Sequence, residues 1–434
     1  MTIDAPTTKR PPKLPSLTGL RFFAALLVFG FHITLSASPI PPNDPINLFA
    51  DERVADTAER IFVTTGYIGV SFFFVLSGFL LAWAAKPGER MTSFWRRRLV
   101  KIFPNHLVMW VLAMVLFAAS ITPAHAVVLN FFLLNSYSPD GAVNVAVNPP
   151  SWTLCSELLF YMLFPLIIIG LRKIPGNRLW FWAAMMVVGM ILVQIINLTV
   201  VPDSPRSALT PVSSFQFWFG YIFPPARLFE FILGSLLARI VMEHRWPAVR
   251  MWQALLACAA GYALANVVPF VWTFNVATIV PIAMLIATAA SGDAAGRSTF
   301  LRSRPMQWLG DTSFGFYLCQ GVVIFWVRQM MQNETFSTPV ALLLIAAFFG
   351  LTILGGWALY ALVEKPIWIG SHGPVGSCSR RPSRQWRRRR CEQREGPTPA
   401  GSGLLAARSA HSRSSVRDPF LHSASEQLER TGCS

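Results

Sequence analysis

The sequence predicts an all-α polytopic membrane protein with about ten transmembrane helices and both termini in the cytoplasm. Of its 434 residues, 53% are hydrophobic and only 13% are charged, about half the charged share of a soluble domain. Apolar stretches of about twenty residues, the length that crosses a bilayer, recur along the chain. Lys and Arg are concentrated in alternate connections between these stretches, as the positive-inside rule requires.

The predicted spanning helices follow from these apolar stretches. We expect them at residues 17–36, 63–84, 100–119, 152–170, 179–200, 218–240, 252–270, 273–290, 309–331 and 338–362. The stretch 121–137 is also apolar, but it is short and contains Pro123 and His125. An interfacial or re-entrant helix is therefore expected there.

The basic residues indicate the orientation. Before Ser371 the chain has 25 Lys and Arg, and 20 of them lie in the N-terminal segment or in alternate connections. The positive-inside rule places these segments in the cytoplasm. The long connections on the opposite side, 37–62 and 120–151, are long enough to cover or shape a site.

Three regions are predicted. Residues 1–16 form a cytoplasmic lead, residues 17–368 a membrane domain, and residues 369–434 an Arg- and Ser-rich cytoplasmic tail that we expect to be disordered. From Ser371 onward, 12 Arg against 5 Asp and Glu contribute +7 of the net charge of +16. The remaining +9 belongs to the membrane body and its short loops, so we expect no nucleic-acid partner.

Two ionisable residues, Arg21 and His32, lie within the first apolar stretch. Eleven helical steps place both side chains on one face, about 16 Å apart along the axis. An ionisable group at membrane depth is costly unless it faces protein or water, so we interpret the pair as part of a functional site. The alternative for His32 is a buried histidine that only packs helices together.

Three more charged residues lie in apolar spans. Arg227 and Glu230 are spaced i, i+3, so they can pair on one helix face. They form either a structural ion pair or a group that orients substrate. Glu157 has no partner nearby in the sequence. Its predicted position is toward the outer side, where it forms a rim carboxylate or a partner for His32.

A basic segment leads into the third span. It contains Arg96, Arg97, Arg98 and Lys101. Such a run commonly fixes topology or contacts anionic lipid. The functional interpretation is a phosphate clamp, because guanidinium groups match phosphate geometry.

The cysteines indicate neither a metal site nor a disulfide framework. The six cysteines are scattered, with no CxxC pair and no His/Cys cluster at zinc-ligand spacing. We therefore expect no metal and no tightly bound cofactor.

In combination, these motifs resemble the membrane-bound acyltransferase-3 family across residues 15 to about 368. In chain order they are LTGLR ending at Arg21 with His32 eleven residues later, GVSFFFVLSGFL at 69–80, IFP ending at Pro104, SWTLCSE ending at Glu157, EFILG starting at Glu230, LGDTSFGFYL at 309–318 and VEKP ending at Pro366.

The resemblance implies an integral-membrane O-acyltransferase of a bacterial cytoplasmic membrane, with cytosolic acyl-CoA as co-substrate. It implies that Arg21 and His32 form the family's R-x10-H pair. It also implies that Arg98 and Lys101 form the acyl-CoA-binding motif, with Arg97 beside them. Lys101 stands where the family usually has Arg. Lysine keeps the positive charge but lacks the bidentate fork of a guanidinium.

The residues themselves fit this chemistry. Transfer of an acyl group to a hydroxyl needs a base, and we assign that role, or that of a transient acyl acceptor, to His32. The thioester carbonyl develops an oxyanion that a cation or ordered donor stabilises. Because about 16 Å separates the pair, we expect Arg21 to contact the CoA part of the donor rather than His32.

Two hypotheses for the function remain. The first is transfer of a short acyl group, acetyl or propionyl, to a hydroxyl of a sugar-containing or macrolide-type natural product or of an envelope glycan. The alternative is a permease or flippase for a polar envelope precursor. The basic segment and the lack of internal repeats favour the enzyme. The sequence leaves the acceptor and the oligomeric state open.

Overall fold

The computed structural model describes residues 12–41, 43–207 and 210–367. Contacts divide the chain into Met1–Gly373 and Pro374–Ser434, and all described residues belong to the first unit. The predicted tail, 369–434, and most of the predicted lead lie outside the described residues. The described part is helical and contains no β-strand, so the all-α prediction is confirmed.

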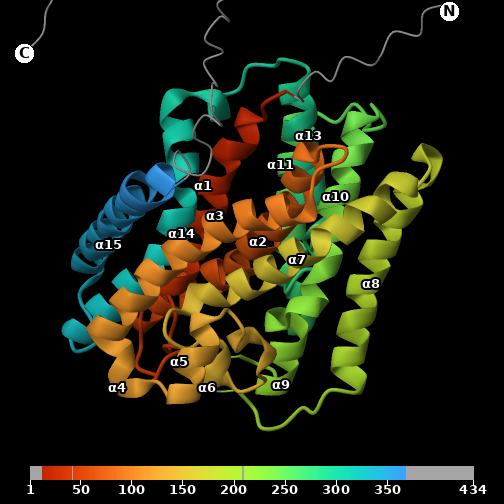
Figure 1. The fold of residues 1–434 in the computed structure, drawn as a ribbon. Helices are drawn as coiled ribbons and strands as arrows, with labels where there is room; N and C mark the ends of the chain where they lie inside the picture. The colour runs from red at the N-terminus through yellow and green to blue at the C-terminus, as the bar shows by residue number, and fades with distance from the viewer. Residues whose placement is uncertain (1–11, 42, 208–209, 368–434) are drawn as a thin grey trace, which may run out of the picture. The chain divides into compact units, whose positions relative to one another are not determined.

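Within the described residues the unit has ten longer helices, and short helical turns connect them (Figure 1). The longer helices are α1 (Pro15–Ile33), α2 (Glu52–Ala84), α3 (Met91–Ala113), α7 (Trp152–Lys173), α8 (Leu179–Thr199), α10 (Leu228–Met242), α11 (Met251–Ala265), α13 (Ile279–Ala294), α14 (Arg304–Met330) and α15 (Thr338–Leu359). The short ones are α4 (Ala119–Ile121), α5 (Ala124–Phe131), α6 (Gly141–Asn144), α9 (Ser214–Phe217) and α12 (Phe270–Thr273).

Six helical segments in the described ranges are long and apolar enough to cross a membrane. They are Pro15–Ile33, Glu52–Ala84, Met91–Ile121, Pro149–Lys173, Gly176–Thr199 and Thr338–Ile367, and they match the first five predicted spans and the tenth. Helices α11 and α13 are apolar but only 15 and 16 residues long. The chain is thus a multi-pass membrane protein, whereas ten spans and cytoplasmic termini stay predictions.

The two least buried of these six segments contain α8 and α15, which lie at opposite edges of the unit (Figure 1). Only 28% and 22% of their most apolar windows are buried against protein. Exposed side chains on these helices include Phe181, Leu192, Leu343 and Leu354. Surfaces this apolar face lipid rather than water.

Helices α2 and α3 begin earlier than predicted. Helix α2 starts at Glu52, so the second half of the predicted loop 37–62 is helical, because Asp51 caps the helix by accepting from the Arg53 and Val54 amides. Helix α3 starts at Met91, so the basic segment lies in a helix and not in a loop. Hydropathy located only the apolar part of each helix.

The predicted span 218–240 is wrong as a single helix. A π-helical turn covers Trp218–Ile222, a 3-10 turn covers Pro224–Arg227, and α10 starts only at Leu228. Pro224 and Pro225 lack the amide hydrogens that a continuous helix needs. The predicted short helix in 121–137 is present as α5, which begins directly after Pro123.

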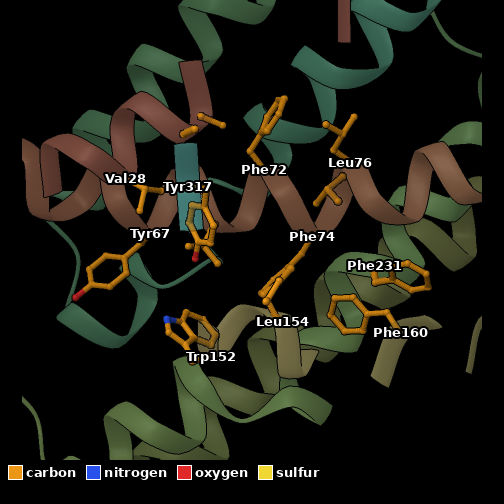
Figure 2. Packing of buried hydrophobic residues seen from close by; sticks show 14 of the residues in the cluster. Val28, Tyr67, Phe72, Phe74, Leu76, Trp152, Leu154, Phe160, Phe231 and Tyr317 are labelled. Carbon is orange, nitrogen blue, oxygen red and sulfur yellow. The ribbon is translucent and has the colours of Figure 1, made fainter. Parts of the chain in front are cut away.

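The aromatic core joins α2 to α7 and α10. Figure 2 shows Phe74 of α2 beside Leu154 and Phe160 of α7, with Phe231 of α10 next to Phe160. The ring centroids of Phe74 and Phe160 are 5.2 Å apart, and those of Phe160 and Phe231 are 4.7 Å apart. This core holds α7 against α2, which fixes the position of Glu157.

Two glycines bring α2 and α10 into backbone contact. A Cβ atom on Gly78 would lie 1.8 Å from the Phe231 carbonyl oxygen, and one on Gly234 would lie 1.9 Å from the Val75 carbonyl oxygen. The Ser235 hydroxyl also donates to the Gly78 carbonyl at 3.0 Å. Any larger residue at either position forces the helices apart.

We therefore expect Gly78→Ala and Gly234→Ala each to lower the free energy of unfolding by about 1–3 kcal/mol, the usual cost of overpacking. Thermal unfolding in detergent measures the change. Gly170→Ala in α7 is the control, because a Cβ there meets nothing within 4 Å and alanine favours a helix. An unchanged melting temperature for Gly78→Ala would contradict this packing.

Candidate functional site

Four of the eight predicted site residues line one cavity of about 80 Å³. Its polar lining consists of Arg21 from α1, Arg98 and Lys101 from α3, and Glu157 and Tyr161 from α7, with Ser77 from α2. We call this space the basic cavity. Three cations and one carboxylate give it an excess of positive charge, which favours an anionic ligand.

Helix α3 determines which basic residues enter the basic cavity. Arg98 and Lys101 are spaced i, i+3 and therefore share a helix face. The guanidinium of Arg98 lies 5.4 Å from the ring centroid of Phe94 and 5.7 Å from that of Tyr161. Arg97 is not among the residues lining the basic cavity and pairs with Glu89. The structure therefore separates Arg97 from the predicted clamp.

Glu157 lies with the cations rather than with His32. Its charged neighbours are Lys101, Arg21 and Arg98, and the Tyr161 hydroxyl donates to its Oε2 atom at 3.2 Å. Of the two alternatives for Glu157, a rim carboxylate or a partner for His32, the second does not match these neighbours. The expectation that no partner lies nearby in the sequence is wrong. Tyr161 is that partner, because it lies one helical turn after Glu157 on the same face.

A second cavity, of about 40 Å³, adjoins the first. Arg21, Glu157, Phe73 and Phe314 line both spaces. Beyond them the lining is apolar except for Thr153 and Tyr317. We call this space the apolar cavity. The hydroxyl oxygens of Thr153 and Tyr317 lie 3.0 Å apart.

His32 lies in the last turn of α1, where only 7% of it is exposed. Its ring centroid is 5.1 Å from that of Phe31 and 6.2 Å from that of Phe325, and the Gln320 side chain lies close to the imidazole. Its Nδ1 atom has no hydrogen-bond partner within the described ranges. His32 lines neither the basic nor the apolar cavity.

Arg227 and Glu230 form the ion pair that their spacing predicts. Arg227 Nε lies 2.8 Å from Glu230 Oε2, and both side chains are fully buried. Arg227 also donates to the Ser71 hydroxyl at 3.2 Å and lies over the rings of Phe74 and Tyr221. The pair lines neither cavity, so this geometry favours the structural role over substrate orientation.

The described residues contain no group of three or more His, Cys, Asp or Glu placed to bind a metal ion.

A family model described as an acyltransferase domain, Acyl_transf_3, matches residues 14–361. The chain belongs to this acyltransferase family. Acyltransferase MdmB of Streptomyces mycarofaciens is 36% identical to it over 382 residues, which cover 85% of this chain and 95% of MdmB. No solved structure matches the chain.

Two more distant relatives of this acyltransferase have glycan-related names. Exopolysaccharide production protein ExoZ of Rhizobium meliloti is 28% identical over 316 residues, covering 70% of this chain and 90% of ExoZ. Peptidoglycan O-acetyltransferase OatA of Listeria monocytogenes is 22% identical over 389 residues, covering 82% of this chain. The match covers 56% of OatA.

Sequence reasoning missed several polar residues near these sites. Tyr161 was detectable, because it follows Glu157 by four residues on one helix face. Thr153, Tyr317 and Gln320 had no such signal. They lie on α7 and α14. The packing of α14 beside α1 and the contact of Tyr317 with Thr153 at the start of α7 bring them close to the predicted residues.

The Arg227–Glu230 pair gives a stability prediction. Glu230→Gln leaves a buried guanidinium without its counter-charge, so we expect it to lower the free energy of unfolding of this acyltransferase by about 3–5 kcal/mol. Thermal unfolding in detergent measures the effect. The double variant Arg227→Met with Glu230→Met should recover much of the loss, because no charge then stays unpaired. A stable Glu230→Gln protein would argue against a structural pair.

Proposed function

We propose that this membrane protein is an O-acyltransferase that moves a short acyl group, acetyl or propionyl, from acyl-CoA to a hydroxyl group. The acceptor class is a sugar-containing or macrolide-type natural product or an envelope glycan. Family membership and the O-acetyltransferase named among its relatives support acyl transfer to oxygen. No comparison supports the permease alternative.

The acyl-CoA proposal rests on one observation, that the basic cavity and the apolar cavity adjoin and share lining residues. The phosphates of CoA are multiply charged, and Arg98, Lys101 and Arg21 offer three cations in one small space. The adjoining apolar cavity suits the uncharged arm and thioester of the donor. Arg21 and Glu157 line both cavities, so they lie where the charged and uncharged parts of the donor meet.

The reacting end of the donor then extends toward His32. Helices α1 and α14 run side by side in the same direction, since Gly310 packs on Thr18 and Phe325 on His32. Tyr317 at the apolar cavity therefore lies on the way from Arg21 to the His32 end of α1. His32 takes the acceptor hydroxyl proton as the oxygen attacks the thioester carbonyl. A transient acyl group on His32 is the second possible route.

The role of His32 is tested with labelled acetyl-CoA and propionyl-CoA in membranes that contain this chain. Extracted glycans, lipids and small metabolites serve as acceptors. We expect His32→Ala and His32→Gln to lower transfer by about 10²–10⁴-fold, the usual contribution of a general base, at equal amounts of inserted protein. Normal transfer by either variant would overturn this role. Absence of transfer by the wild-type protein would overturn the proposed function.

The cations of the basic cavity give a separate prediction. Arg98→Gln and Lys101→Met each remove a charge-assisted contact of about 1.5–3 kcal/mol, so we expect KM for acyl-CoA to rise about 10–150-fold. Steady-state kinetics with varied acyl-CoA measures the change. Arg96→Gln on the same helix is the control, since Arg96 is exposed and is not part of the cavity lining. An unchanged KM in both cavity variants would exclude this binding site.

A further inference from the structure

Gln320 is a fully buried amide whose two polar atoms are both unused. Its side chain is 0% exposed, and neither Oε1 nor Nε2 has a hydrogen-bond partner in the part of the chain that the structure describes. Burying such a group without partners costs about 1–3 kcal/mol per polar atom. A residue that served only the fold would be apolar at this position.

The surroundings of Gln320 place it beside the proposed base. Its side chain lies close to the imidazole of His32 without forming a hydrogen bond to it, and the His32 Nδ1 atom is also buried and unpartnered within the described ranges. Gln320 also lies three residues, or about one helical turn, after Tyr317 at the apolar cavity. Gln320 itself does not line the apolar cavity. It lies one turn beyond that cavity along α14, at the end where α14 packs on His32.

Residues 148–150 of the same chain pack over this region. A Cβ atom on Gly321 would lie 2.0 Å from Asn148 Oδ1 and 2.4 Å from Pro150 Cδ, so glycine allows the segment around residues 148–150 to pack directly on α14. Asn148 Nδ2 donates to the Leu318 carbonyl at 3.2 Å and holds the segment in place. Gln320 is therefore enclosed by protein, where a hydrogen bond to a developing charge is worth more than in water.

We propose that Gln320 is a catalytic residue that donates a hydrogen bond from Nε2 to the acyl carbonyl oxygen during transfer. This inference rests on the proposed function. The acceptor oxygen bonds to the acyl carbon, and the carbonyl electron pair moves onto the oxygen that Gln320 holds. The pair returns as the carbon–sulfur bond breaks. The acceptor proton passes to His32 and then to the CoA thiolate, so atoms and charge balance.

The test is Gln320→Met in the full chain, which keeps the side-chain length and removes the donor. We expect kcat to fall about 10²–10³-fold, as for other lost oxyanion donors, with KM for acyl-CoA unchanged within error. The melting temperature should be equal to or higher than that of wild type, because two unpaired buried polar atoms are removed. Gln320→Asn retains a donor and should keep more activity than Gln320→Met.

Gln194→Met is the matched control. Gln194 is also fully buried, but its amide donates to the Gly220 carbonyl at 3.2 Å and accepts from Asn197 at 3.2 Å. Its loss should lower the melting temperature and leave kcat per folded molecule unchanged. The opposite signs for the two glutamines separate a catalytic amide from a structural one.

The outcomes are distinguishable. Wild-type kcat in Gln320→Met, or a lower melting temperature in that variant, overturns the role of Gln320 and leaves the proposed function intact. In a His32→Ala background, Gln320→Met should reduce the residual rate far less than in wild type, since both act in one step. A full 10²-fold further loss there would contradict a shared step. Absence of wild-type transfer from acyl-CoA overturns both proposals.

Discussion

The site depends on the cost of keeping charge among apolar helices. Arg21, Arg98 and Lys101 surround the carboxylate of Glu157, and one carboxylate cannot neutralise three cations. The excess is tolerated because the side chains line a cavity rather than a dry core. At Arg227 and Glu230 the cost of burying charge is compensated in another way, because one cation pairs with one anion and the pair is fully buried. The unbalanced group therefore suits ligand binding, whereas the balanced pair suits the fold.

Helix α2 connects these two arrangements. Its residues Phe73 and Phe74 line the apolar cavity, and Ser71 on the same helix accepts from Arg227. Gly78 brings α2 against the backbone of α10. Small residues of this kind allow close helix packing in membranes, where the hydrophobic effect does not drive helices together. The positions of the cavity walls thus depend on backbone contacts one or two helical turns away.

The predicted elements differ in how well sequence determined them. The first span was located well because apolar residues fill it from Leu17 onward, and α1 covers Pro15–Ile33. The predicted spans for α2 and α3 begin too late, because the N-terminal parts of these helices are charged and hydropathy does not detect a charged helical turn. The interruption before Leu228 was visible in the sequence as Pro224 and Pro225, and it was missed because the flanking residues are apolar.

The sequence by itself determined the helical membrane class, the family and the contact between Arg227 and Glu230. Each depends on local spacing or composition, which helix geometry converts directly into structure. Only the tertiary structure decided that Glu157 lies beside Arg21 and Lys101 in the basic cavity. It also decided that Arg97 lies outside this cavity and that Gln320 lies next to His32. These side chains come from different helices, or from different faces of one helix. Their proximity depends on how helices pack and rotate against one another, which spacing along a single chain does not specify.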